Sequence, residues 1–312
     1  MQKARKLNFL SLYFSSIGFK ESLQTFLSLF TLPFLSENKL RLKLHKLFSA
    51  NLNNNAVFSY SSARASLTAC LNAVDISKDD EVLLSSFSCL AVPTAILAAG
   101  AIPKYYDINT QTMNADLESI KGLITSNTKV IVLQHSLGTP APIDPVKEII
   151  AEKNIIIIED CALSIGTTDG HQLVGTNADA SIFSLELSKT ISCGWGGILL
   201  VNEKQLEERV KTQYKEVGDL GLIKEIKMAL QVSISGFLYS PSIFFIGKYL
   251  IAIFFKLGIF SASTPPGEER GQLRKDFLSK LPKSLLPLAN IQVLRLNEII
   301  TRHSKNSIRL RK

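Results

Sequence analysis

The sequence predicts an α/β fold with a mostly parallel central sheet, and three observations support this prediction. Between residues 79 and 201, short apolar stretches of strand length alternate with helical patterns, as in parallel sheets that helices cover on both faces. The four consecutive isoleucines at 155–158 form a β-branched run that suits a strand buried on both faces. With 46% hydrophobic residues, the 312-residue chain can also fill a large core.

The expected elements follow one another in a regular order. An N-terminal helical segment, residues 1–55, comes first; its start superficially resembles a signal peptide but has no small-x-small cleavage site. In the core that follows, residues 56–222, strands are expected at 81–85, 102–106, 129–134, 155–158, 180–183 and 198–201. Helices are expected from a small-residue turn at 62–64 up to residue 74, and at 91–99, 117–124 and 145–153.

Charged side chains follow two of these strands. Glu159 and Asp160 come directly after the isoleucine run, at the edge of the sheet where α/β proteins bind ligands. Lys189 follows the next strand, about one strand-plus-connection unit later. A lysine shielded from water can act as a nucleophile toward an aldehyde. An aspartate that faces a pyridine nitrogen keeps that nitrogen protonated, so that the ring can accept electrons.

A second candidate ligand site lies earlier in the chain. Ser62, Ala63 and Arg64 form a small-residue turn that opens a helix. Free backbone N–H groups and the positive end of the helix dipole at such a position suit a phosphate. Taken alone this is a weak signal, because any helix start offers the same groups.

An ordered set of motifs identifies the chain as similar to a known family. The set comprises Glu159-Asp160-Cys161-Ala162, Gly166, Val174-Gly175, Phe183-Ser184, Lys189 and Gly194-Trp195-Gly196-Gly197. Their order and spacing resemble those of the DegT/StrS nucleotide-sugar aminotransferases, which are fold-type I enzymes that use pyridoxal phosphate. The resemblance covers about residues 56 to 305 and is strongest from 56 to 201. It implies the three-layer large domain of the fold-type I transferases.

The resemblance also implies roles for individual residues. Lys189 would bind pyridoxal phosphate covalently and shuttle a proton, and Asp160 would stabilise the protonated pyridine. Ser184 and the turn Ser62-Ala63-Arg64 would hold the phosphate, although Ala63 and Arg64 stand where the family has glycine and threonine. Cys89 occupies the position of the family's aromatic residue that stacks on the cofactor ring.

Three further positions concern the substrate and the distance from the family pattern. His135 resembles the histidine of the family's H-x-x-G motif, and we expect it to line the substrate site. Glu186 stands where many relatives carry histidine or an aromatic residue, and we expect it near the substrate too. Leu163 replaces a polar side chain that helps to hold the cofactor in the family.

Composition excludes several other classes of site. The four cysteines are scattered without paired or zinc-ligand spacing, so reduced thiols are expected and no metal site is predicted. The net charge of +8 is concentrated at the C-terminal end, where residues 270–312 carry eleven Lys or Arg and two acids. Because no nucleic-acid-binding motif accompanies this charge, no nucleic-acid partner is expected.

The chain changes character after residue 222. Residues 223–267 form an apolar helical insertion, in which Pro241 and Lys248 interrupt any run of the ~18–20 residues that a membrane span requires. This insertion could pack on the core, form a dimer contact or lie at a membrane surface. Residues 268–312 contain a helical pattern at 285–300 that resembles the family's linker helix toward a small C-terminal domain. That domain is expected to be missing or truncated.

These predictions combine into one functional hypothesis. The resemblance implies a cytoplasmic, homodimeric aminotransferase that moves an amino group from an amino acid, usually glutamate, to a nucleotide-linked keto sugar. The apolar insertion leaves peripheral contact with the inner face of the membrane open. Two alternatives remain. One is a pyridoxal-phosphate-dependent sugar dehydratase, although such enzymes typically carry histidine at the position of Lys189. The other is a non-catalytic or membrane-associated homologue, which the departures at Cys89 and Leu163 would support.

Overall fold

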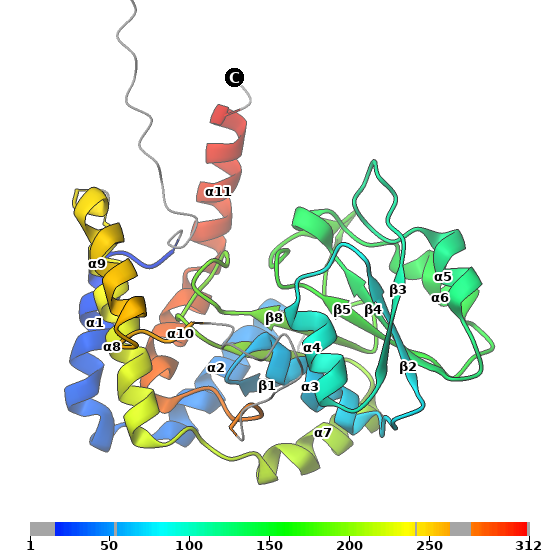
Figure 1. The fold of residues 1–312 in the computed structure, drawn as a ribbon, viewed down its shortest axis with the longest axis horizontal. Helices are drawn as coiled ribbons and strands as arrows, with labels where there is room; N and C mark the ends of the chain where they lie inside the picture. The colour runs from blue at the N-terminus through cyan, green and yellow to red at the C-terminus, as the bar shows by residue number, and fades with distance from the viewer. Residues whose placement is uncertain (1–15, 53–54, 241, 263–275, 311–312) are drawn as a thin grey trace, which may run out of the picture.

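A computed structural model describes residues 16–52, 55–240, 242–262 and 276–310. Its centre is a seven-stranded sheet with the strand order β1-β9-β8-β5-β4-β2-β3 (Figure 1). The strands are β1 (Ala56–Tyr60), β2 (Glu81–Ser85), β3 (Ile102–Tyr106), β4 (Thr128–Gln134), β5 (Ile156–Asp160), β8 (Ala180–Ser184) and β9 (Gly197–Val201). β9 pairs antiparallel with both β1 and β8, and the other strand pairs are parallel. The predicted mostly parallel α/β sheet is therefore confirmed.

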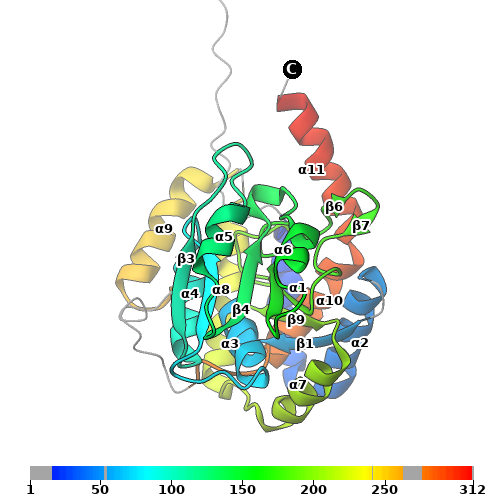
Figure 2. The ribbon, with the colours of Figure 1, turned by 90° about the vertical axis from the view of Figure 1, so that its right-hand side faces the viewer.

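Helices cover both faces of the sheet, so the molecule has three layers (Figures 1 and 2). On one face α3 (Ala63–Ala73), α4 (Ala91–Ala98) and α7 (Lys204–Glu216) bury their apolar residues against every second strand residue. On the other face α5 (Leu117–Leu123) and α6 (Ile143–Ile149) cover β2, β4 and β5. The same face of β1, β8 and β9 is covered by α2 (Glu37–Asn51) and α10 (Leu286–Leu294).

Three further helices form a group beside the sheet. α1 (Phe19–Thr31) packs along α8 (Leu222–Leu238), and α9 (Phe244–Lys256) returns along α8. In Figure 1 this group lies to the left of the sheet, and α11 (Leu296–Leu310) projects from the body. Short elements complete the chain: a hairpin of β6 (Thr168–Asp169) and β7 (Gln172–Leu173), and 3-10 turns at Leu32–Phe34, Ser136–Gly138 and Lys283–Leu285. None of the described helices is long and apolar enough to cross a membrane.

The expected elements agree with the structure apart from their ends and a few omissions. All six expected strands are present, and the isoleucine strand continues through Asp160. β1 and α7 are additional elements, and the expected helix at 285–300 is divided at Arg295 into α10 and α11. The N-terminal segment is helical over most of its described part, whereas residues 1–15 and the end of the expected insertion, residues 263–267, lie outside the described residues.

The first residue of β9 makes a close approach between the sheet and a helix. A Cβ atom on Gly197 would lie 2.3 Å from the carbonyl carbon of Ser62 and from the backbone nitrogen of Ala63. These two residues begin α3, and Gly197 also pairs with Tyr60 of β1 and Ser184 of β8. Glycine at this position therefore allows the start of α3 to lie directly on the sheet.

We expect the Gly197→Ala substitution to lower the free energy of unfolding by about 1–3 kcal/mol, because the added methyl group would overlap backbone atoms that cannot rotate away. Thermal unfolding followed by circular dichroism measures this change. The matched control is Gly122→Ala in α5, where an added Cβ meets no atom within 4 Å and alanine favours the helix. Equal melting temperatures for the two variants would contradict the proposed close approach.

Candidate functional site

Three segments that are distant in sequence meet at one edge of the sheet. Asp160 ends β5 and Ser184 ends β8, and these two strands are parallel neighbours. Gly197, at the start of β9, pairs with Ser184, and the preceding Gly196 bridges to Ser62. The structure thus brings the predicted residues Ser62, Ser184 and Asp160 to the same end of adjacent strands.

Ser62 begins α3 in the way that helix N-caps usually do. It has an extended backbone, with φ −160° and ψ 162°, and its Oγ accepts a hydrogen bond of 3.1 Å from the backbone N–H of Ala65. Ala63 and Arg64 follow in the first turn and are half-buried. Because the hydroxyl group of Ser62 can still donate its hydrogen, this turn combines an O–H donor with the positive end of α3, as anion sites require.

Asp160 is a buried carboxyl group with one oxygen already in use. Asp160 is 6% exposed, and its Oδ1 accepts a hydrogen bond of 3.0 Å from the backbone N–H of Ala162. Within the described part of the chain, no hydrogen bond reaches Oδ2. Burial raises the pKa of Asp160, and the Ala162 N–H, the Lys189 ammonium group and His135 each lower it. Lys189 thus acts electrostatically on Asp160, and the role of the two residues as a cofactor-binding pair stays a prediction.

Lys189 stands at the end of a tight turn that Glu186 begins. The backbone N–H of Lys189 donates a hydrogen bond of 3.0 Å to the carbonyl oxygen of Glu186. The Glu186 carboxylate accepts hydrogen bonds from both the backbone N–H and the hydroxyl group of Ser188. The predicted substrate residue Glu186 therefore helps to shape the turn that presents Lys189, and its contact with substrate stays a prediction.

A cavity lies beside this turn. It has a volume of 350 Å³, and residues of the turn, of the loop before β9 and of α8 and α9 line it, including Glu186, Trp195, Tyr239 and Phe255. Neither Asp160, Lys189, Ser184 nor Ser62 is among its lining residues. The cavity is therefore a neighbour of the predicted cofactor site and is distinct from it.

Cys89 lies on the loop after β2, at the same end of the sheet as Asp160. It is an exposed free thiol. Two hydrogen bonds of the Phe87 backbone hold this loop. The N–H of Phe87 donates to Ser85 Oγ at 3.1 Å, and the carbonyl oxygen of Phe87 accepts from Gln134 Nε2 at 3.1 Å. Contact between Cys89 and a cofactor ring stays a prediction.

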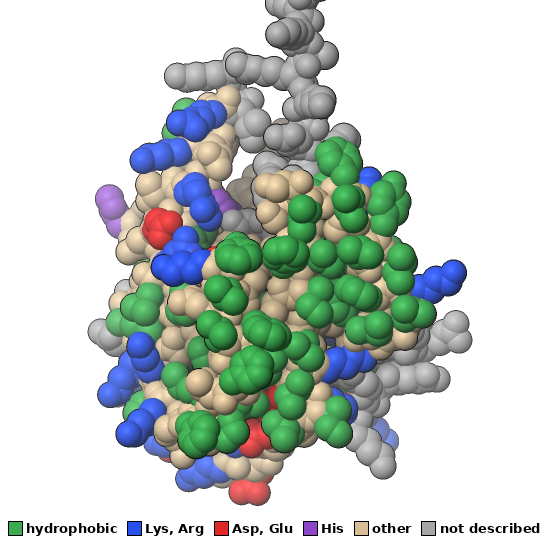
Figure 3. Space-filling model, turned by 90° about the vertical axis from the view of Figure 1, so that its left-hand side faces the viewer, with side chains coloured by type: hydrophobic (Ala, Val, Ile, Leu, Met, Phe, Trp, Pro, Cys, Tyr) green, Lys and Arg blue, Asp and Glu red, His purple; other side chains and the backbone are tan. Residues whose placement is uncertain are grey.

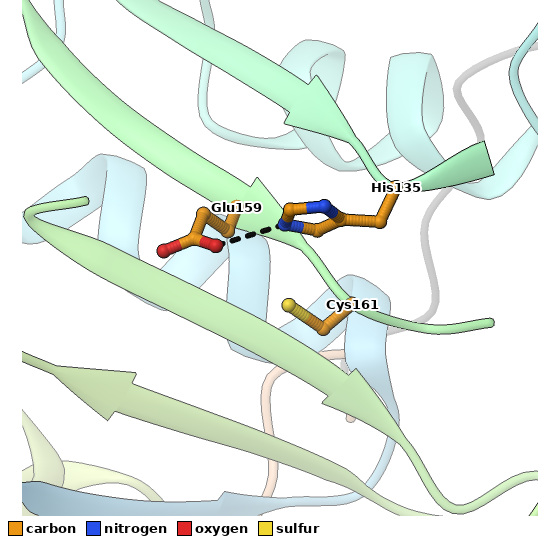
Figure 4. Close-up of side chains that lie close together, drawn as sticks. All are labelled: His135, Glu159 and Cys161. Atoms are coloured by element: carbon orange, nitrogen blue, oxygen red, sulfur yellow. Dashed lines mark hydrogen bonds and ion pairs between the residues drawn. The ribbon is translucent and has the colours of Figure 1, made fainter. Parts of the chain in front are cut away.

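His135 has a different environment from the one expected. It is 1% exposed, and its Nδ1 accepts a hydrogen bond of 2.8 Å from the backbone N–H of Ala141. Since Nδ1 is an acceptor, Nε2 carries the hydrogen, and it lies 2.8 Å from Oε2 of Glu159 (Figure 4). Both ring nitrogens are thus engaged inside the protein. The geometry gives His135 a structural role and leaves it no nitrogen for a substrate.

Glu159, which the sequence places at the ligand-binding edge of the sheet without a role of its own, is the buried acceptor of this network. Besides His135, its carboxylate accepts hydrogen bonds from the backbone N–H groups of Gly175, Asn177 and Ala178 at 2.7, 3.0 and 2.8 Å. Burial alone would raise the pKa of Glu159, but the His135 and backbone hydrogen bonds together bring this pKa below its usual value. The Val174-Gly175 motif was the sequence signal for this role of Glu159. Gly175 has φ +89° and turns the chain back toward the Glu159 carboxylate.

The same place contains three potential metal ligands. One atom each of His135, Glu159 and Cys161 lies within 4.8 Å of the others (Figure 4). However, His135 and Glu159 are already hydrogen-bonded to each other. Burial raises the pKa of the Cys161 thiol well above its usual value. Because a metal would require a thiolate and a free imidazole nitrogen, this donor set fits a hydrogen-bonded network better than a metal centre.

Comparison with known sequences gives a consistent family match. The sequence model of the DegT/DnrJ/EryC1/StrS aminotransferase family matches residues 20–230. GDP-perosamine synthase from Escherichia coli O157:H7 is 32% identical over 173 residues, which cover 55% of this chain and 45% of that enzyme. The chain thus spans less than half the length of this relative.

Solved structures share the fold. An aminotransferase involved in pseudoaminic acid biosynthesis, PseC from Helicobacter pylori, superposes with a TM-score of 0.62 at 18% identity, over 88% of this chain and 62% of that one. NtdA from Bacillus subtilis, whose structure contains bound cofactor PMP, gives a TM-score of 0.60 at 27% identity, over 70% of this chain and 50% of that one.

We expect Glu159→Gln to lower the free energy of unfolding by at least about 2 kcal/mol, because an amide NH₂ would face buried N–H donors. The folded-state pKa of Glu159 is lower than the unfolded value of 4.5. The stabilisation by the carboxylate is therefore present above pH 4.5 and is lost as the pH falls through the folded-state pKa. The difference between the two proteins should accordingly shrink in acid, as urea unfolding at several pH values would measure.

The exposed Glu148 in α6 provides the control, since Glu148→Gln removes the same charge at the surface. It should leave the unfolding midpoint within the error of the measurement. If Glu159→Gln behaved like Glu148→Gln, the hydrogen-bonded network around Glu159 would have no part in stability.

Proposed function

The chain belongs to the DegT/DnrJ/EryC1/StrS aminotransferase family, and we propose that it binds pyridoxal phosphate and transfers an amino group from an amino acid to a keto sugar. One observation carries the proposal: Asp160, a buried carboxyl group whose pKa Lys189 lowers, ends β5 at the same end of the sheet as Ser184 and as Ser62 at the start of α3. Similarity to GDP-perosamine synthase supports a nucleotide-linked sugar as the acceptor. Glutamate is the proposed amino donor, on the family resemblance.

The residues present fit this cofactor. Oδ2 of Asp160 is without a hydrogen-bond donor among the described residues, and a protonated ring nitrogen would supply one. The dipole of α3 and the Ser62 hydroxyl group would receive the phosphate, together with Ser184 on the adjoining strand end. Gly197 lets the start of α3 lie directly against this strand end, because a Cβ there would overlap backbone atoms of Ser62 and Ala63.

Each proposed role follows from the position of its residue. When bound, pyridoxal phosphate supplies an electron sink for a carbanion formed at the amino acid Cα. The Asp160 carboxylate would keep the proton on the ring nitrogen, because an anion at this position favours the charged ring. The Lys189 amine would be the nucleophile that holds the cofactor and, once displaced, the base that moves the Cα proton.

Lys189 also favours amino transfer over dehydration. The sugar dehydratases of this type carry histidine in place of the lysine, according to the family resemblance. A chain that retains both Lys189 and Asp160 keeps the groups that amino transfer needs. Neither Leu163 nor Cys89 removes a member of this pair, so we favour an enzyme over a non-catalytic homologue.

We also propose that the chain acts as a homodimer in the cytoplasm, in contact with the inner face of the membrane. Apolar side chains on the loops that follow β2, β4 and β5 support the dimer: Phe87, Leu137 and Leu163 are 45%, 70% and 45% exposed. They lie at the same end of the sheet as Asp160. A second subunit placed there would cover them and exclude water from the site.

If the proposed roles are correct, borohydride reduction in the presence of pyridoxal phosphate should label Lys189, as peptide mapping by mass spectrometry would show. Asp160→Asn should retain the far-ultraviolet circular dichroism of the wild type. Its amino transfer to a nucleotide-linked keto sugar should fall by about 10²–10³-fold, because the charge that stabilises the protonated ring is lost. Asp169→Asn, on the exposed hairpin strand β6, serves as the control and should be unaffected.

A label on another lysine would refute the role of Lys189. Normal turnover of the Asp160→Asn protein would refute the role of Asp160. Labelling of Lys189 without any amino transfer would instead support cofactor binding by a non-catalytic homologue.

A further inference from the structure

The outer side of the helices α1, α8 and α9 forms a broad apolar face. Figure 3 shows this face, on which hydrophobic side chains gather across the centre and right of the view. The apolar face includes Phe26 and Phe30 of α1, Ile223 of α8, and Phe245, Ile246 and Tyr249 of α9, which are between 40% and 84% exposed. A soluble surface seldom exposes so continuous an apolar patch without a partner.

α1 is turned with its polar side toward the protein. Its buried residues are Glu21, Ser22, Thr25 and Ser28, whereas its phenylalanines and most of its leucines face outward. The hydroxyl groups of Ser22, Thr25 and Ser28 donate hydrogen bonds to backbone carbonyls inside the same helix, at 2.9, 2.9 and 2.7 Å. A helix in water normally buries its apolar side. The orientation of α1 is the one expected where the surroundings of the protein are themselves apolar.

Two glycines allow close contacts among the three helices, beside larger apolar contacts such as that of Phe19 in α1 with Phe237 in α8. A Cβ on Gly236 of α8 would lie 2.0 Å from Oγ of Ser22, and a Cβ on Gly247 of α9 would lie 1.9 Å from the carbonyl oxygen of Leu238. Small residues that let helix backbones approach closely, with the large apolar residues outside, are typical of helices that pack in lipid. Packing and orientation therefore point to the same kind of environment.

The charges on these helices are sorted by sign. The acids Glu21 and Glu225 are both 6% exposed: Glu21 pairs with Arg295, and Glu225 accepts the backbone N–H groups of Lys283 and Ser284. α9 contains no acid. The exposed charged residues include Lys20, Lys248 and Lys256, and the Lys248 ammonium group lies 4.9 Å from the ring centre of Tyr249. The apolar face is thus bordered by cations.

We propose that the apolar face docks on a phospholipid bilayer with anionic headgroups. The aromatic and aliphatic side chains would enter the boundary between headgroups and acyl chains, and the lysines would contact the phosphates. Since no described helix can cross a membrane, the three helices would lie in the surface. A second copy of the chain fits less well, because a symmetric contact would bring lysines together without exposed acids on these helices to pair with them.

Vesicle co-flotation tests this proposal with the purified chain. We expect the protein to float with vesicles of phosphatidylcholine and 30% phosphatidylglycerol, to bind pure phosphatidylcholine at least about tenfold more weakly, and to dissociate as the salt concentration rises. The double variant Phe30→Glu, Ile246→Glu should lose at least about tenfold in affinity for the anionic vesicles, because each glutamate replaces an inserted side chain and adds a negative charge. Lys248→Gln combined with Lys256→Gln should weaken binding to anionic vesicles and leave binding to neutral vesicles unchanged.

The control variant is Leu97→Glu, Ile308→Glu, which places the same charges on exposed apolar positions of α4 and α11. It should float like the wild type, and circular dichroism should show that both double variants are folded. Equal flotation of the two double variants would overturn the proposal. A wild type that remains unbound but dimerises in sedimentation equilibrium, with Phe30→Glu, Ile246→Glu monomeric, would assign the apolar face to a second copy instead. The lipid readout requires neither cofactor nor turnover, so it is independent of the proposed amino transfer.

Discussion

The hydrogen bonds to the Glu159 carboxylate fix the end of the strand on which the candidate site is built. They connect the residue before Asp160 to His135 after β4 and to the N–H groups at 175–178 before β8. The backbone N–H of His135 in turn donates to the carbonyl oxygen of Asp160 at 3.1 Å. A buried carboxylate with this many donors favours one conformation strongly, because each unsatisfied donor would cost free energy. Asp160 therefore has a fixed position before any ligand arrives.

Local patterns were sufficient to predict six of the seven strands of the sheet and the residues at its edge. Most strands were recognisable because they are short apolar runs between polar turns. Asp160 and Ser184 come at the ends of two such runs, and Lys189 follows in the turn after the second. β1 was missed because its residues precede the turn at Ser62 without a clear pattern of alternation, and its place beside β9 depends on a partner about 140 residues away. Long-range pairing of this kind has no local signal.

The environments of individual side chains were harder to predict. His135 follows a strand, as a substrate-binding residue would, and only the acceptors and donors around it show that both nitrogens are engaged. The periodicity of α1 indicates two faces but does not say which face is buried; the neighbouring α8 decides this, because Gly236 accommodates Ser22. The general tendency of a helix in water to bury its apolar side would place the phenylalanines of α1 inside.

The glycines of the motif at 194–197 connect the candidate site to the rest of the molecule, and each has a different neighbour. Gly194 has φ +93°, and a Cβ there would lie 2.1 Å from Val232 of α8. Gly196 has φ +141° and lies against Leu281, while Gly197 lies against the start of α3. The loop that follows Lys189 is thus packed between the proposed phosphate-binding helix and α8. Because the outer side of α8 belongs to the apolar face, any partner docked there rests on the same helix that positions this loop.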